Sequence, residues 1–128
     1  MSQAPEDLLR SFELRAREQA ERAALLSRRL EQASVVVESA NGEVRLSVDS
    51  TGGLSGLTFG SAAGRLPLDR LAELVLQTSR RAQVRLAESM GAVVAQVYGD
   101  DSDTATFVSR VYAERFPSPE QDEEGERR

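Results

Sequence analysis

The chain has 128 residues, of which 40% are hydrophobic and 29% charged, and these values are typical of one ordinary globular domain. It contains neither cysteine nor histidine, and all 16 basic residues are arginine, so disulfides, Cys-based zinc sites, histidine general bases and Schiff-base lysines are excluded. The net charge of -5 arises in the C-terminal part, because residues 1–99 hold 12 arginines and 12 acids whereas residues 100–128 hold 4 and 9. We therefore expect a non-enzymatic protein without cofactor, metal or small-molecule substrate. The alternative, a hydrolase built on carboxylates alone, has no motif in its favour.

A long helix is predicted from Pro5, because proline suits the first helical position and Glu6 and Asp7 place negative charge at the positive end of the helix dipole. An apolar seam then recurs in steps of three and four residues over nearly four heptads, with Gln19 as its only polar member. The seam comprises Leu9, Phe12, Ala16, Gln19, Ala23, Leu26, Leu30 and Ala33. A stripe on a helix of roughly 40 Å needs an apolar partner of similar length.

Three short strands are predicted next, over residues 34–39, 43–49 and 54–59. The first strand is rich in valine. The second alternates strictly, with Val44, Leu46 and Val48 on one face. These strands predict a three-stranded antiparallel meander with exposed edges, which a second subunit would cover or pair with.

Glycine-rich turns are predicted between the strands. Asn41-Gly42 favours a tight hairpin because both residues tolerate positive φ, and a second turn is predicted over residues 50–53. Gly56 interrupts the alternation of the third strand and indicates a bulge. The glycines between Gly52 and Gly64 do not have the spacing of a phosphate-binding loop, so we interpret them as turn and bulge positions.

A second long helix is predicted after a loop over residues 60–66, beginning at Pro67 and ending near Gly99. Its apolar side comprises Leu68, Leu71, Ala72, Val75, Ala82, Leu86, Met90, Val93 and Val97. Gly91, with several alanines around it, indicates close packing against another backbone.

A third, shorter helix is predicted with Asp103 as its N-cap and Pro117 as its terminator. Its apolar stripe comprises Phe107, Val108, Val111, Tyr112 and Phe116. This stripe is expected to pack on the protein's own body, and recruitment of a partner is the alternative. Residues 119–128 contain no apolar side chain, which predicts a disordered acidic tail over residues 117–128.

The predicted fold class is therefore α+β, with the order long helix, three-stranded antiparallel meander, long helix and short C-terminal helix. Three segments are expected: a domain over residues 1–99, an additional helix over residues 100–116 and the tail over residues 117–128. Two helices of about 30 residues around one small sheet bury little core for their surface, which favours a dimer.

Seven arginines on the two long helices are candidates for contacts with DNA phosphates. Arg15, Arg22 and Arg29 recur every seven residues and form a row with a spacing of roughly 10 Å. The segments 22–30 and 74–87 each hold three arginines and no acid. The candidate residues are Arg15, Arg22, Arg28, Arg29, Arg80, Arg81 and Arg85. The alternative is an ordinary solvated face, in which Glu18 pairs with Arg22 along the helix.

Two stretches carry a resemblance to a known family. They are V-x-x-x-x-G-x-V-x-L-x-V-D-x-x-G-G-L from Val37 to Leu54 and L-x-x-L-A-E-L-V-L-Q from Leu68 to Gln77. Together with the preceding heptad helix, they resemble the YbaB/EbfC family of bacterial nucleoid-associated proteins, over roughly residues 8–97. The resemblance implies a homodimer with joined sheets and projecting helices that binds duplex DNA with little sequence preference. The chain differs from the family in having arginine where lysine is common, and in its C-terminal extension.

The sequence thus predicts a cytoplasmic, nucleoid-associated homodimer that binds duplex DNA through phosphate contacts and has no membrane segment. A protein-interaction adaptor is the alternative, with the third helix or an apolar groove as its binding surface. Exposure of the third helix's apolar stripe favours the adaptor, and burial of that stripe counts against it.

Overall fold

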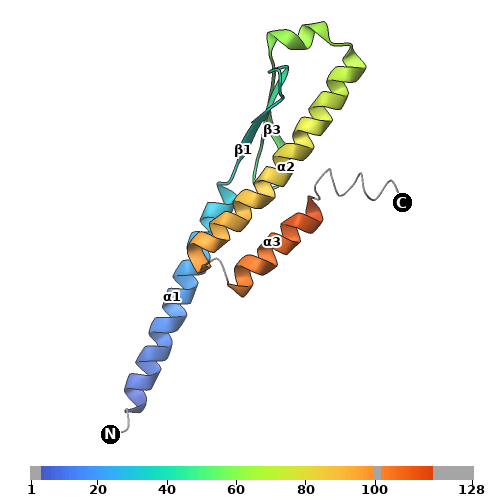
Figure 1. Cartoon of the computed structure of the whole chain (residues 1–128). Helices are drawn as coiled ribbons and strands as arrows, with labels where there is room; N and C mark the ends of the chain where they lie inside the picture. Colours follow the sequence, from blue (N-terminus) through green and yellow to red (C-terminus); the bar gives the residue numbers. More distant parts are fainter. Residues whose placement is uncertain (1–3, 100–101, 117–128) are drawn as a thin grey trace, which may run out of the picture.

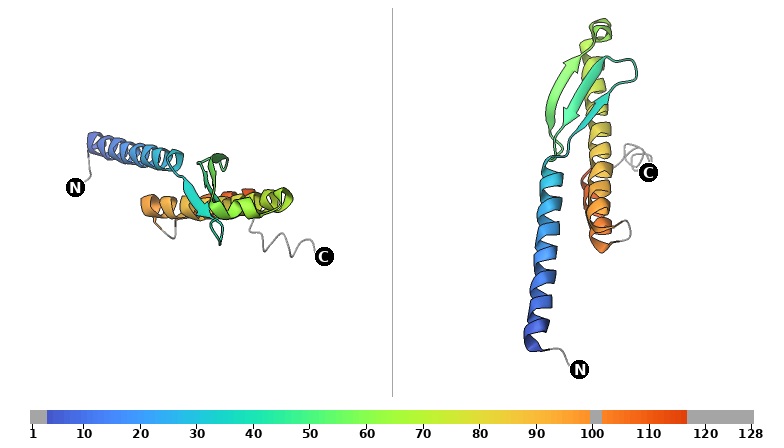
Figure 2. Two further views of the ribbon diagram at one scale, coloured as in Figure 1. Left: turned by 90° about the horizontal axis from the view of Figure 1, so that it is seen from above. Right: turned by 90° about the vertical axis from the view of Figure 1, so that its left-hand side faces the viewer.

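The computed structural model describes residues 4–99 and 102–116, and its elements confirm the predicted α+β class and order. They are α1 (Pro5–Glu31), β1 (Val35–Glu38), β2 (Val44–Val48), β3 (Leu54–Phe59), the 3-10 helix η1 (Ser61–Arg65), α2 (Leu68–Tyr98) and α3 (Asp103–Arg115). The molecule is elongated: the sheet lies against the N-terminal half of α2, α1 extends away past the other end, and α3 packs back along α2 (Figures 1 and 2). The predicted acidic tail, residues 117–128, lies outside the described residues.

The helix α1 begins as predicted, with Pro5 in its first turn together with Glu6 and Asp7. Its last turn carries Arg28 and Arg29, whose charges complement the negative end of the helix dipole. The side chains of residues 5–24 are all exposed, and only the C-terminal part packs against α2, through half-buried leucines. The chain itself therefore covers only a fraction of the predicted apolar seam.

The core lies between the inner face of the sheet and one side of α2. The sheet has the order β1-β2-β3 with both pairs antiparallel, and the alternating side chains of β2 point toward α2. The fully buried cluster comprises Val37, Val44, Leu46, Val48, Ala82, Leu86 and Met90. Each of the larger side chains stabilises the fold by about 1.5–3 kcal/mol when removed from water.

The inner face of β3 continues this apolar surface but is not covered. Its Leu54, Leu57 and Phe59 are register partners of β2 residues that are buried against α2, so they belong to the same side of the sheet. The helix packs on β1 and β2, and the three β3 side chains remain 42 to 53% exposed. A register irregularity opposite Ser47 and Val48 confirms a bulge next to Gly56.

The β1–β2 hairpin has the predicted position but a different turn. Only Gly42 has positive φ (74°), whereas Asn41 does not, and the chain closes where Ser39 N donates to the Val44 carbonyl (2.8 Å). The loop is therefore four residues long instead of two. The buried Ser39 hydroxyl stabilises this longer loop, because it accepts a hydrogen bond from Val44 N–H at 3.0 Å and its own O–H donates to the Glu43 carboxylate at 3.1 Å.

Three further expectations are corrected by the helical segments. Residues 61–65 form a 3-10 helix where a loop was expected. Ser102, not Asp103, caps α3, because its hydroxyl accepts a hydrogen bond from Ala105 N at 3.0 Å. Leu68, the first residue of α2, was expected on the apolar side but is 84% exposed.

The buried seam of α2 includes Thr78 and Val94, which the apolar pattern did not contain. Thr78 is tolerated there because its hydroxyl donates to the Leu74 carbonyl oxygen (2.7 Å). The predicted close approach at Gly91 is confirmed, since a Cβ atom at that position would lie 2.8 Å from the hydroxyl oxygen of Ser109 in α3.

Candidate nucleic-acid interface

Four candidate arginines, Arg15, Arg22, Arg28 and Arg29, lie on α1 and are here called the α1 arginines. All four side chains are exposed, in keeping with the heptad row that the sequence predicts. Arg15 lies on the part of the helix that extends beyond the rest of the chain, which is coloured blue in Figure 1. The row therefore begins on a projecting arm and ends where α1 meets α2.

Arg22 and Arg29 line a shallow groove between α1 and the C-terminal part of α2. The Arg22 guanidinium lies 5.7 Å from the centre of the Tyr98 ring, a cation–π contact that orients it across the two helices. Glu18 and Glu21 line the same groove, so the charge there is mixed. These two arginines thus lie on a surface that they share with carboxylates.

The other three candidates, Arg80, Arg81 and Arg85, lie in the middle of α2 and are here called the α2 arginines. All three are exposed. Arg81 and Arg85 are four residues apart and share one side of the helix, whereas Arg80 lies about 100° around the axis from Arg81. The helix thus presents positive charge on two adjoining sides, away from its buried seam.

The structure does not bring all seven candidates into one patch. Gln96, which lines the groove with Arg22 and Arg29, is fifteen residues from Arg81, which corresponds to about 22 Å along α2. The chain therefore carries two separate arginine-bearing regions, of which the one on α1 also holds carboxylates. Gln83 lies among the α2 arginines but points to the sheet, where its side-chain amide donates to the Gly52 carbonyl at 3.0 Å.

Sequence reasoning missed the residues that join distant elements. Tyr98 carries no pattern that distinguishes it from a core residue, and its contact with Arg22 depends on how α1 and α2 cross. Arg115 was not a candidate, yet its guanidinium donates to the Thr51 carbonyl (3.3 Å) and lies 5.3 Å from the centre of the Phe116 ring. These contacts join residues that are far apart in the chain, so no local sequence pattern predicts them.

The turn between β2 and β3 carries a stable negative charge. Thr51 donates two hydrogen bonds to one carboxylate oxygen of Asp49, from its hydroxyl at 2.6 Å and from its backbone N–H at 2.9 Å. These bonds, the hydroxyl bond first, lower the pKa of Asp49 below its ordinary value. An anion at this turn disfavours the approach of a phosphate to it.

Two other kinds of site can be assessed within residues 4–99 and 102–116. Those residues include no cluster of three or more carboxylates that could hold a metal ion. No helix in the same part of the chain is long and apolar enough to cross a bilayer.

The fold and surface define a class of protein. It is an α+β chain with two long arginine-bearing helices and a small sheet, and apolar side chains are left exposed on α1 and on β3. This chain belongs to the YbaB/EbfC DNA-binding family, whose sequence profile matches residues 9–101. The match confirms the family resemblance, and it spans most of α1, the sheet and α2 but ends before α3. The family is nucleoid-associated and is not known for enzymatic activity. A search of the curated proteins gave no match to the chain.

Proposed function

We propose that this chain is a non-enzymatic, nucleoid-associated protein of the cytoplasm that binds duplex DNA as a homodimer through phosphate contacts. The match to a DNA-binding family over residues 9–101 is the observation that carries this proposal. Binding of this kind has little sequence preference, because phosphates are the same at every base pair.

The side chains available at the surface favour phosphate contacts over base recognition. Arginine presents a planar fork of donors that matches phosphate oxygens, and both arginine groups lie at the surface of helices. Base reading usually adds Asn or Gln beside the arginines. The one glutamine within the α2 arginines, Gln83, is already engaged with the sheet.

A second copy of the chain is the proposed partner of the open apolar surfaces. Leu57 and Phe59 on β3 and the seam of α1 around Phe12 are exposed, Phe12 at 70%. Surfaces of this kind mark an interface, and β3 also has a free strand edge. Pairing two copies would cover these surfaces and place two sets of arginines on one particle.

The proposal is tested by fluorescence anisotropy with a random-sequence duplex at about 50 and 200 mM salt. We expect affinity that falls steeply with salt and varies little between duplexes of equal length. The triple variant R80A/R81A/R85A should bind at least about tenfold more weakly, with a salt slope reduced by about one for each phosphate that the variant no longer binds. The matched control R45A/R65A/R70A removes the same charge from positions outside the candidate set and should change binding much less.

Two outcomes would contradict parts of this proposal. Equal weakening in both triple variants would show that general charge matters and that the α2 arginines are not the site. Absence of binding by the wild-type protein at low salt would overturn DNA binding altogether.

The adaptor function is the second candidate, and one observation favours it. Phe107 and Val111 lie four residues apart on α3 and are 63% and 42% exposed, in a helix beyond the family match. Two other members of the stripe count against the adaptor function, because Tyr112 and Phe116 are packed against the core. Loss of DNA binding in the test above would therefore direct attention to the exposed part of α3.

A further inference from the structure

The C-terminal end of α3 is fixed on the turn between β2 and β3. The Phe116 ring packs against Gly52, where a Cβ atom would overlap it. Arg115 donates a hydrogen bond to the Thr51 carbonyl at 3.3 Å, and Gln83 of α2 donates one to the Gly52 carbonyl at 3.0 Å. The chain therefore leaves α3 at a defined place, beside the middle of α2.

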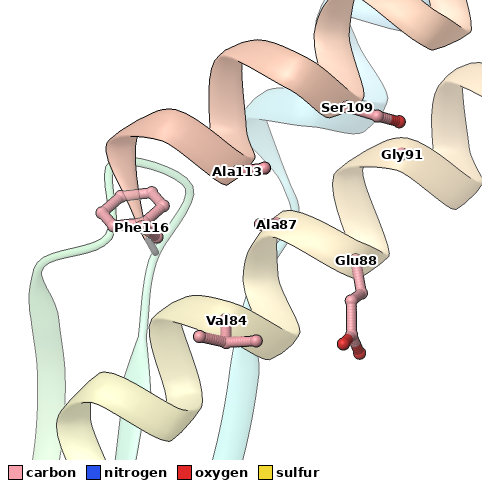
Figure 3. A pocket seen from close by; sticks show the side chains of 7 residues that line it. All are labelled: Val84, Ala87, Glu88, Gly91, Ser109, Ala113 and Phe116. Atoms are coloured by element: carbon pink, nitrogen blue, oxygen red, sulfur yellow. The ribbon is translucent and has the colours of Figure 1, made fainter. Parts of the chain in front are cut away.

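This place adjoins the α2 arginines. Gly91 contacts Ser109, and seven residues earlier Val84 shares a groove with Phe116, so α3 runs antiparallel to α2 (Figure 3). Four residues before Val84 on the same side of α2 is Arg80, about 6 Å further along the helix axis. Arg80 is therefore the α2 arginine on the side of the helix that faces the end of α3.

The twelve residues that follow have the complementary charge. Residues 117–128 hold two arginines and five acids, which are Glu120, Asp122, Glu123, Glu124 and Glu126. An extended chain of four residues from Phe116 to Glu120 spans about 13 Å, compared with about 6 Å along the axis of α2 from Val84 to Arg80. The α1 arginines are less suitable partners, because their groove lies about 20 Å further along α2 in the opposite direction and already holds two carboxylates.

We propose that the acidic segment 117–128 binds the α2 arginines of its own chain and competes there with nucleic-acid phosphates. The short connection to Phe116 keeps the carboxylates at a high effective concentration beside Arg80, so weak ion pairs suffice. Salt weakens both the internal contact and DNA binding. The competition rests on the proposed function, whereas the internal contact does not.

The contact is tested on the full chain by paramagnetic relaxation in solution. Because the chain has no cysteine, Gly125→Cys gives a single position for a nitroxide label. At about 50 mM salt we expect the label to reduce the amide signals of residues 77–85 strongly, and at about 500 mM salt we expect them to recover. Labelled protein without isotope, mixed with isotope-labelled wild type, should show no such reduction, because the contact is within one chain.

Matched variants identify the charges responsible. The signal reduction should disappear in E120Q/D122N/E123Q/E124Q/E126Q and in R80A/R81A/R85A, and it should persist in R22A/R28A/R29A. A reduction that survives neutralisation of the segment, or that is absent from the full chain at low salt, would overturn the proposal.

Anisotropy then separates the contact from its consequence. The neutralised segment should raise affinity for duplex DNA about tenfold at low salt, and this gain should be absent when the α2 arginines are also replaced. If the signal reduction is seen but no variant binds DNA, the proposed function fails and the contact stands. If DNA binds with unchanged affinity and no signal reduction is seen, the internal contact fails alone.

Discussion

Gly52 meets a backbone requirement and a packing requirement at once. Its φ of 86° lies in the left-handed region that side chains disfavour, and it closes the β2–β3 turn by donating its N–H to the Asp49 carbonyl at 3.0 Å. Its missing side chain also leaves the space that the Phe116 ring fills. The residue therefore couples the sheet to the end of α3.

Replacing Gly52 by alanine should strain the turn and expel the Phe116 ring. We expect the free energy of unfolding to fall by about 1–3 kcal/mol, measured by urea denaturation followed by circular dichroism. The matched control is Gly53→Ala, since Gly53 does not have positive φ and a Cβ there would lie 3.4 Å from the Thr51 hydroxyl. Equal effects of the two substitutions would show that Phe116 is not held by Gly52.

At this scale the sequence could predict turn positions but not their contacts. Gly52 was recognised as a turn residue, whereas its contact with Phe116, 64 positions later, depends on how α3 returns along α2. The cap of α3 was placed one residue late, because Ser102 and Asp103 are both good capping residues and the sequence does not rank them. The sequence assigned the arginines to two helices, but it could not show how far apart the two groups lie in the fold.

The helix α2 is the element on which the others are assembled, since it contacts β1, β2, α1 and α3. The ends of α2 were predicted closely, because Pro67 precedes its first residue and Gly99 follows its last. The apolar periodicity predicted the buried side of α2 less well. It placed Val93 on that side, whereas Val94 is fully buried and Val93 only partly. A helix packed on more than one side does not have a single apolar stripe, so the sequence pattern alone is ambiguous.

The central seam of α2 should dominate the stability of the fold. Leu86 is fully buried in the core cluster, and Leu86→Ala should lower the free energy of unfolding by about 3 kcal/mol through reduced burial and the cavity left behind. Leu68→Ala, at a position 84% exposed, should change it by less than about 0.5 kcal/mol. Both free energies are measured by denaturant titration at one protein concentration. A small decrease for Leu86→Ala would mean that the sheet does not depend on α2.

A single copy of this chain leaves large apolar side chains exposed to water on two of its elements. The inner face of β3 and the projecting part of α1 are exposed on different elements of one chain. The sequence anticipated this from the shortage of core relative to helix length. It could not show which face of which strand stays open, because that depends on where α2 crosses the sheet.

Dimerisation can be tested with two neighbouring residues of β3. Leu57→Asp places a charge on the open inner face, and we expect it to shift the sedimentation coefficient from that of a dimer to that of a monomer at micromolar concentration. Thr58→Asp introduces the same charge on the opposite face of the strand and should leave the dimer intact. Dimers that survive Leu57→Asp, or a wild type that sediments as a monomer, would contradict the proposed assembly.

In the proposed dimer, the projecting part of α1 would link folding to protein concentration. A segment of about 20 residues whose side chains are all exposed has only marginal helical stability in water. If a second copy covers its seam, association becomes the step that orders the arm, and the ordered fraction rises as the protein accumulates. Arg15 lies on that arm, so its position would be fixed only when the arm is ordered. The cell's supply of this protein would then set both the number of particles and the length of ordered, arginine-bearing helix that each one presents.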